Sequence, residues 1–162
     1  DGKITQKLMP QGQHSRLQDK LGKAINTTAE SQKIACSFPE LHCTFGGSSI
    51  VPDIAVFEWV RIPKDDNGRI ANVFLLAPDW TIEILSPGKR PTKVTKNILR
   101  CLKYGTQMGW LIDLEDESVF VHGRGQEIEI FDLDEPAAAL PMPAFMGELT
   151  LTVENLFALL IL

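Results

Sequence analysis

The sequence is poor in cysteine and has no long hydrophobic run, and these two absences narrow the possible function classes. Its 162 residues include 3 cysteines, and no two of them form a CxxC pair. Neither a disulfide framework nor a zinc-binding spacing is therefore indicated. The longest apolar run, LFALLIL at residues 156–162, is far shorter than the ~20 residues that cross a bilayer. We expect a cytoplasmic protein with no membrane role.

The sequence also lacks a positive net charge, which argues against a protein that coats nucleic acid without specificity. The formal net charge is -5, with 16 Lys and Arg against 21 Asp and Glu. The charge is unevenly placed, because residues 84–112 contain bases and no acid, whereas Arg124 is the only base in residues 113–135. A local basic surface can still bind a phosphate backbone, since charges attract over a Debye length of roughly 10 Å. A solvated helix face without a ligand is the alternative. The bases of the first segment are Lys89, Arg90, Lys93, Lys96, Arg100 and Lys103.

A chain of this length forms about one domain, and we expect a single domain over residues 1–162. Apolar residues recur at helical spacing in residues 13–26 and 93–104, and TVENLFALLIL predicts a closing helix after Thr152. Strands are expected where apolar and β-branched residues run between turn residues. The predicted strands cover residues 3–9, 33–38, 41–45, 50–60, 80–85, 109–113, 118–123 and 126–131.

The order of these elements predicts the fold class. Strand, helix and strand around residues 80–113 form a crossover unit, which joins parallel strands, while the acidic turn LEDE separates two strands as in a hairpin. The sheet should therefore be mixed, with helices on its faces. The predicted class is α/β (α+β), with a mixed central β-sheet flanked by helices.

Two carboxylates interrupt apolar strands. Asp53 precedes the run IAVF, and Glu83 lies 30 residues later inside WTIEIL. An isolated ionised carboxylate in an apolar interior is costly and is normally neutralised, paired or bound to a metal. If the two strands are neighbours, the acids could share one Mg²⁺ or Mn²⁺ ion. The alternatives are that Asp53 is a turn acid bound to local N–H groups and that Glu83 lies on the exposed face of an edge strand.

The predicted helix after Glu83 offers cations for such a site. At about 100° per residue, its apolar residues gather on one side and three bases gather on the opposite side. Lys93 and Asn97 fall between the two faces, so Lys93 is a better choice than Lys96 for an amine that reaches over the sheet. The apolar residues are Val94, Ile98, Cys101 and Leu102, and the opposite bases are Lys96, Arg100 and Lys103.

The segments VPDIAVFEW, PDWTIEILSP and GWLID, with a basic helix before the last, resemble the bacterial Uma-type family of putative restriction endonucleases in the PD-(D/E)XK nuclease superfamily. The resemblance covers most of the chain, because the motifs occur in the family's order and spacing. It implies a restriction-endonuclease-like core and a Mg²⁺-dependent endonuclease in which Asp53 and Glu83 bind the metal. His14 and Gln18 match the first helix, which skirts the site in this family.

The sequence departs from the superfamily pattern at the catalytic lysine. That lysine usually lies two residues after the second acid, where this chain has Leu85. In the family it has moved to the following helix, near Asn97, so we expect Lys93 to replace it from one turn earlier. The predicted catalytic set is Asp53, Glu83 and Lys93, with His14, Gln18, Lys96 and Asn97 as secondary candidates.

The leading function is therefore hydrolysis of phosphodiester bonds in nucleic acid, with DNA as the expected substrate. Phosphate contacts are predicted for Lys89, Arg90, Lys96, Arg100 and Lys103. A homodimer is one way for a protein with one site per chain to cut two strands. The alternatives are a catalytically degenerate binding or assembly module with the nuclease fold, and a hydrolase of another phosphate ester.

Overall fold

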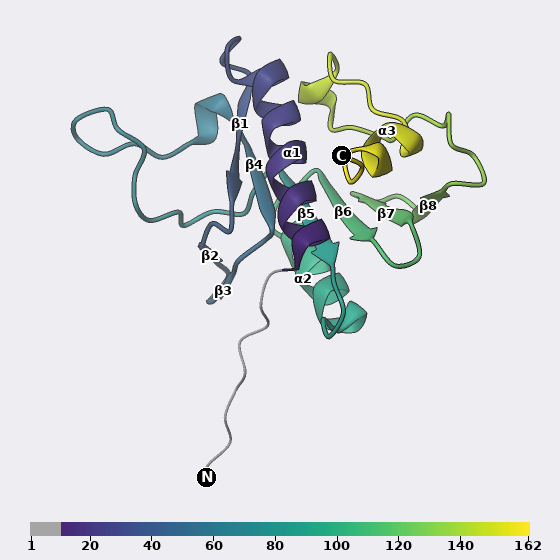
Figure 1. Cartoon of the computed structure of the whole chain (residues 1–162). Helices are drawn as coiled ribbons and strands as arrows, with labels where there is room; N and C mark the ends of the chain where they lie inside the picture. Colours follow the sequence, from purple (N-terminus) through teal and green to yellow (C-terminus); the bar gives the residue numbers. More distant parts are fainter. Residues whose placement is uncertain (1–10) are drawn as a thin grey trace.

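The computed structural model describes residues 11–162, which are built around a six-stranded sheet in the order β1-β4-β5-β6-β7-β8 (Figure 1). β5 and β6 are parallel, and every other pair of neighbours is antiparallel. The predicted mixed sheet is thereby confirmed. Its strands are β1 (Ala35–Pro39), β4 (Ile54–Glu58), β5 (Trp80–Leu85), β6 (Met108–Asp113), β7 (Ser118–Gly123) and β8 (Glu129–Asp132).

Helices and a small hairpin surround this sheet. The hairpin consists of β2 (Cys43–Phe45) and β3 (Ser48–Ile50). The helices are α1 (Gly12–Ala29), α2 (Pro91–Lys103) and α3 (Val153–Ala158), with short 3-10 turns η1 (Trp59–Arg61) and η2 (Ala144–Met146). None of the helices in residues 11–162 has the length and apolar character needed to cross a membrane.

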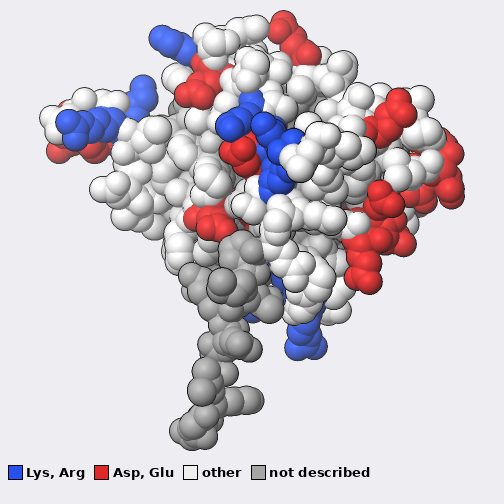
Figure 2. All heavy atoms as spheres, in the orientation of Figure 1, with Lys and Arg blue, Asp and Glu red and all other residues white. Residues whose placement is uncertain are grey.

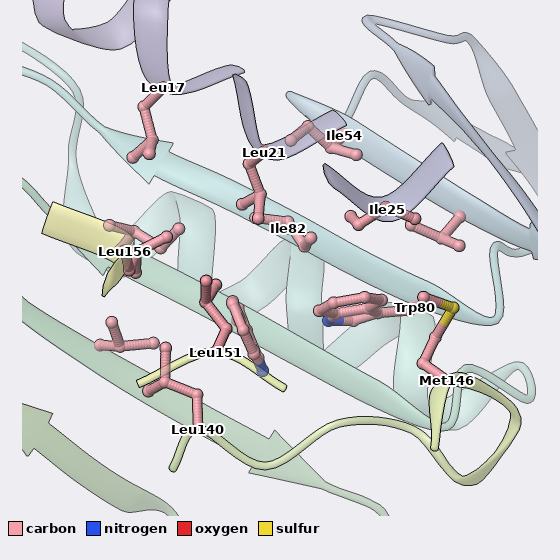
Figure 3. Close-up of a cluster of buried hydrophobic side chains, with 14 of the residues drawn as sticks. Leu17, Leu21, Ile25, Ile54, Trp80, Ile82, Leu140, Met146, Leu151 and Leu156 are labelled. Carbon is pink, nitrogen blue, oxygen red and sulfur yellow. The ribbon is translucent and has the colours of Figure 1, made fainter. Parts of the chain in front are cut away.

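One face of the sheet forms the main apolar core (Figure 3). The helix α1 has Leu17, Leu21 and Ile25 on its buried side, because these residues recur at spacings of four. They pack against Ile82 of β5. The C-terminal segment completes this core with Leu140, Met146, Leu151 and Leu156.

The helix α2 covers the opposite face of the sheet. Val94 and Ile98 form a buried cluster with Leu111 of β6. Ile98 packs so closely on Gly109 that a Cβ there would lie 2.4 Å from its Cγ2 atom. Gly109 is therefore needed for the close approach of helix and strand.

Most of the predicted elements occur near their predicted bounds. The strands 80–85 and 118–123 match β5 and β7, and the helix predicted over 93–104 spans 91–103. The Thr152 hydroxyl accepts a hydrogen bond from the Asn155 N–H at 3.1 Å, which confirms the predicted start of the closing helix. The prediction of one strand over 50–60 is wrong, because Pro52 has no N–H and the chain bends at Asp53 between β3 and β4. The strand predicted over 3–9 lies outside the described residues.

A long connection between η1 and β5 projects from one side of the molecule (Figure 1). We call residues 60–75, which include the last two residues of η1, the arm. It is closed by an isolated bridge between Lys64 and Ile70, and it carries Val60, Val73 and Leu75 with exposed side chains. The arm lies at the β1 side of the sheet, away from β7 and β8.

Candidate active site

The two predicted carboxylates lie side by side where β4 begins and β5 ends. The strands are antiparallel neighbours in which Ile54 pairs with Ile82, so the next positions along them are Asp53 and Glu83. The Asp53 N–H donates a hydrogen bond to Glu83 Oε1 at 3.0 Å. Asp53 is 6% exposed and Glu83 is 5% exposed. Their burial rejects the alternative that Glu83 lies on a solvent-exposed strand face.

Protein donors surround the Asp53 carboxylate. Its Oδ2 atom accepts hydrogen bonds from the Ile84 N–H at 2.7 Å and from Lys89 Nζ at 3.0 Å. Its Oδ1 atom lies 3.2 Å from His14 Nε2. The charge of Asp53 is therefore compensated by groups from a strand, a turn and a helix.

The helix α1 delivers two of the secondary candidates to this carboxylate. His14 and Gln18 are separated by four residues, so they lie on the same side of the helix, one turn apart. The Gln18 side-chain amide donates to the Asp53 main-chain carbonyl at 2.8 Å. His14 is 7% exposed, and its Nδ1 atom is buried without a hydrogen-bond partner among the described residues. The first helix thus holds both the backbone and the side chain of Asp53.

The amine beside Asp53 is Lys89, for which the sequence predicted only a phosphate contact. The connection from β5 to α2 turns back at Gly88, whose φ of +88° favours glycine. The Lys89 N–H donates to the Ser86 carbonyl at 3.0 Å and closes this turn. The sequence feature that could have revealed Lys89 is the turn SPGK, because a glycine turn directly after the strand returns the next side chain to the strand end.

Lys93 occupies a different position. It is exposed in the first turn of α2, and it makes no ion pair with Asp53 or Glu83 among the residues the structure describes. Asn97, one turn later, is half-buried, and Lys96 is exposed. The structure therefore brings Asp53, Glu83, His14 and Gln18 together with Lys89, and it does not bring the ammonium group of Lys93 into contact with the carboxylates.

Arg100 of the predicted basic surface has hydrogen-bond partners within the protein. Its guanidinium donates to the Phe45 carbonyl, and to the Ser48 carbonyl at 3.1 Å. It also stacks over the Phe45 ring, 4.5 Å from the ring centre. Arg100 therefore attaches the β2–β3 hairpin to α2. Arg90, Lys96 and Lys103 of the predicted basic surface are exposed.

The two carboxylates have opposite pKa shifts. Burial alone would raise the pKa of Asp53, but the hydrogen bond from His14, the Lys89 charge and the Ile84 N–H together hold it below its ordinary value. Burial, followed by the negative charge of Asp53, raises the pKa of Glu83 to about 7. Glu83 is thus the acid whose charge is incompletely compensated by the protein.

This donor set fits a hard divalent cation held by two carboxylates and water. Mg²⁺ is commonly bound through one or two carboxylates while it keeps several water molecules. The described residues contain no group of three His, Cys, Asp or Glu side chains that could hold a metal by themselves. A cation beside Glu83 would supply the missing positive charge that its raised pKa indicates.

A cavity of about 290 Å³ opens beside the site. It is bordered by His14 of α1, by Ser86 and Pro87 of the β5–α2 turn, and by Glu115 after β6. The cavity gives a small group access to the region between the first helix and the turn that carries Lys89.

The sheet, its crossover helix and a carboxylate pair at two adjacent central strands define a restriction-endonuclease-like α+β protein. The chain belongs to the Uma2 family, described as "Putative restriction endonuclease", whose family model matches residues 1–154. It is also similar to a crystal structure described as a putative nuclease belonging to DUF820 from Anabaena variabilis ATCC 29413. The sequences are 58% identical, and the match has a TM-score of 0.93 and covers 99% of this chain and 89% of that chain. The comparison with curated proteins gave no significant match.

Proposed function

We propose that this protein is a Mg²⁺-dependent endonuclease that hydrolyses phosphodiester bonds in DNA. The observation that carries the proposal is the contact between the buried Asp53 and Glu83, next to the ammonium group of Lys89. Membership of the Uma2 family and similarity to the Anabaena protein support a nuclease activity. Asp53 and Glu83 would hold the metal, whose chemistry is to lower the pKa of a bound water and to neutralise charge on the phosphate.

The remaining residues have roles that follow from their contacts. Lys89 places a positive charge at the strand ends, where it can orient a water molecule or stabilise negative charge that develops on the phosphate. His14 and Gln18 fix the side chain and the carbonyl of Asp53, so they are positioning residues. The exposed Arg90 follows Lys89 directly in the sequence and can bind the phosphate backbone.

Calorimetric titration with Mg²⁺ or Mn²⁺ tests the metal site without any assumption about the substrate. We expect binding by the intact protein and loss of that binding in Asp53→Ala and in Glu83→Ala. Glu127→Ala is the matched control, because Glu127 is an exposed acid outside the site. Loss of binding in the control as well would contradict the assignment of the metal to Asp53 and Glu83.

Cleavage of plasmid and single-stranded DNA then tests the enzymatic proposal and identifies the amine. We expect Lys89→Met to reduce cleavage by about 100-fold or more, as removal of a charge-stabilising group commonly does. Lys93→Met, four residues later in the first turn of α2, is its matched control. A large loss in Lys93→Met with no loss in Lys89→Met would return the catalytic role to Lys93.

A non-catalytic module with the nuclease fold is the second candidate. It is favoured by the contacts of Asp53, whose two carboxylate oxygens have three partners within the protein, Lys89, Ile84 and His14. Under this proposal the intact protein would bind neither Mg²⁺ nor Mn²⁺, in the absence or presence of DNA. Metal binding that depends on Asp53 and Glu83 would exclude it.

A further inference from the structure

An apolar surface lies on the α2 side of β7 and β8. We call Leu99, Leu102, Phe120, Ile128 and Ile130 the apolar band. Phe120 and Ile130 are paired across β7 and β8, so their side chains lie on the same face of the sheet. Leu102 and Phe120 both pack against the cluster formed by Val94, Ile98 and Leu111, which places this face on the side of α2. The band therefore runs from the helix to the last strand of the sheet.

Much of the apolar band is open to solvent. Leu99 is 50% exposed, Ile128 is 52% exposed and Ile130 is 60% exposed. The opposite face of the same strands is closed, because Val119, Val121 and Phe131 pack into the main core. Contiguous apolar surface of this kind marks an interaction site more often than scattered exposed residues do.

Opposite charges border the two sides of the band. On α2, the exposed Lys96 and Lys103 lie three residues before and four residues after Leu99, so they flank it on the helix surface. On the other side, β8 and its two flanking turns carry acids. Figure 2 shows acidic side chains gathered along the side of the molecule where β7 and β8 lie. The acids around β8 are Glu127, Asp132, Asp134 and Glu135, whereas Glu129 pairs with Val121 and so lies on the main-core face of the sheet.

We propose that the apolar band is the interface between two copies of this chain related by a two-fold axis. A two-fold axis brings one patch against the same patch of the partner, so the surface must be complementary to itself. The band meets this requirement when the two-fold axis crosses its middle at right angles to its length. The basic side of α2 in one copy then faces the acidic side around β8 in the other. Leu99 of one copy then packs near Ile130 of the other.

The charges also exclude two other occupants. Pairing of two β8 strands edge to edge would bring the acids around Glu129 and Asp132 of both copies together, and like charges protect an edge strand from such pairing. Nucleic acid is disfavoured at this surface for the same reason, since the acids would repel phosphates. A second copy of the chain satisfies both the apolar and the charged parts of the surface.

The proposed dimer is independent of the proposed nuclease activity, because it is tested by molar mass and not by cleavage. The molar mass of the intact protein is determined by light scattering and by sedimentation over a range of concentrations. We expect a dimer that weakens as salt is added. In Leu99→Asp and in Ile130→Asp the dimer should be at least about tenfold weaker, because each change buries a charge in the interface.

The matched control is Val73→Asp in the arm, which introduces the same charge at a residue that is 65% exposed. It should remain dimeric, and circular dichroism should show that all three variants are folded. The double variant Lys96→Glu and Lys103→Glu tests the charge complementarity, and it should also weaken the dimer. A monomeric intact protein, a dimer unaffected by Leu99→Asp and Ile130→Asp, a dimer lost in Val73→Asp, or an unchanged double variant would each overturn the proposal.

Discussion

The two faces of β5 are equally hidden from solvent but differ in how the buried groups are stabilised. On one face, Trp80, Ile82 and Ile84 are 0% exposed and belong to the main apolar core. On the other face, Glu83 is 5% exposed and contacts the Asp53 N–H. A strand covered on both faces usually has a continuous apolar sequence. A carboxylate in such a strand therefore needs neighbouring donors, or a bound cation, that compensate its charge.

A substitution on the apolar face of β5 should change the free energy of unfolding most. Ile82→Ala should lower the free energy of unfolding by about 2–5 kcal/mol, because it removes buried methylene groups and leaves a cavity in the core. Unfolding in urea measures this change. Leu75→Ala in the arm is the control, since Leu75 is 70% exposed and its loss should change stability by no more than about 0.5 kcal/mol. Equal effects in the two variants would mean that the core face of β5 is not closely packed.

A substitution of Glu83, on the other face of β5, should raise the free energy of unfolding. Glu83→Gln should stabilise the protein at pH 8 by about 2–3 kcal/mol when metal is removed by a chelator, because the pKa of Glu83 is raised from 4.5 to about 7. Between these two values the folded wild type holds a proton that the unfolded chain has released. The stability of the wild type therefore falls as pH rises through this window, and the variant lacks this loss.

Urea unfolding from pH 4 to pH 8 measures the prediction for Glu83. The gain in Glu83→Gln should disappear at the acid end, where the wild-type carboxyl is protonated in both states. Glu127→Gln, at an exposed acid, should show no pH-dependent gain. A gain that is the same at every pH would show that the charge of Glu83 is not its cause. Protonation of Glu83 should also weaken Mg²⁺ binding below about pH 7, because a protonated carboxyl is a poor metal ligand.

Removal of the lysine charge beside Asp53 should have the smallest effect of the three on the free energy of unfolding. Lys89→Met should lower the free energy of unfolding at pH 7 by about 1–2 kcal/mol, because it removes a partly buried hydrogen bond between charged groups. The lowered pKa of Asp53 means that the ion pair contributes above the ordinary pKa of the carboxyl, and that this contribution is lost as pH falls through the lowered value. The loss in Lys89→Met should therefore shrink in acid.

Lys93→Met provides the comparison for Lys89, because Lys93 is an exposed lysine with no ion pair to the carboxylates among residues 11–162. Its stability should stay within about 0.5 kcal/mol of the wild type. If Lys93→Met destabilised the protein as much as Lys89→Met does, the contact between Lys89 and Asp53 would not be the cause of the loss.

Several features of the fold and of the site could be predicted from local sequence patterns. The bounds of β5 and the helical stripe of α1 follow from the alternation and periodicity of apolar residues, which depend only on backbone geometry. The sequence predicted that Asp53 and Glu83 could share one cation if their strands were neighbours, and the register of β4 and β5 makes these strands neighbours and brings the two acids together. The fold class and the family followed from the order of the motifs.

The tertiary structure decided which cation lies beside the carboxylates. Helical periodicity placed Lys93 at the edge of α2, but the glycine turn at Gly88 returns Lys89 to the strand end instead. Arg100 appeared free on the basic face, yet the β2–β3 hairpin folds back and supplies carbonyl groups that bind it. Sequence periodicity determines the side of an element on which a residue lies. The partner that it meets there depends on segments distant in the sequence, and their approach is fixed only when the sheet register and the turns are formed.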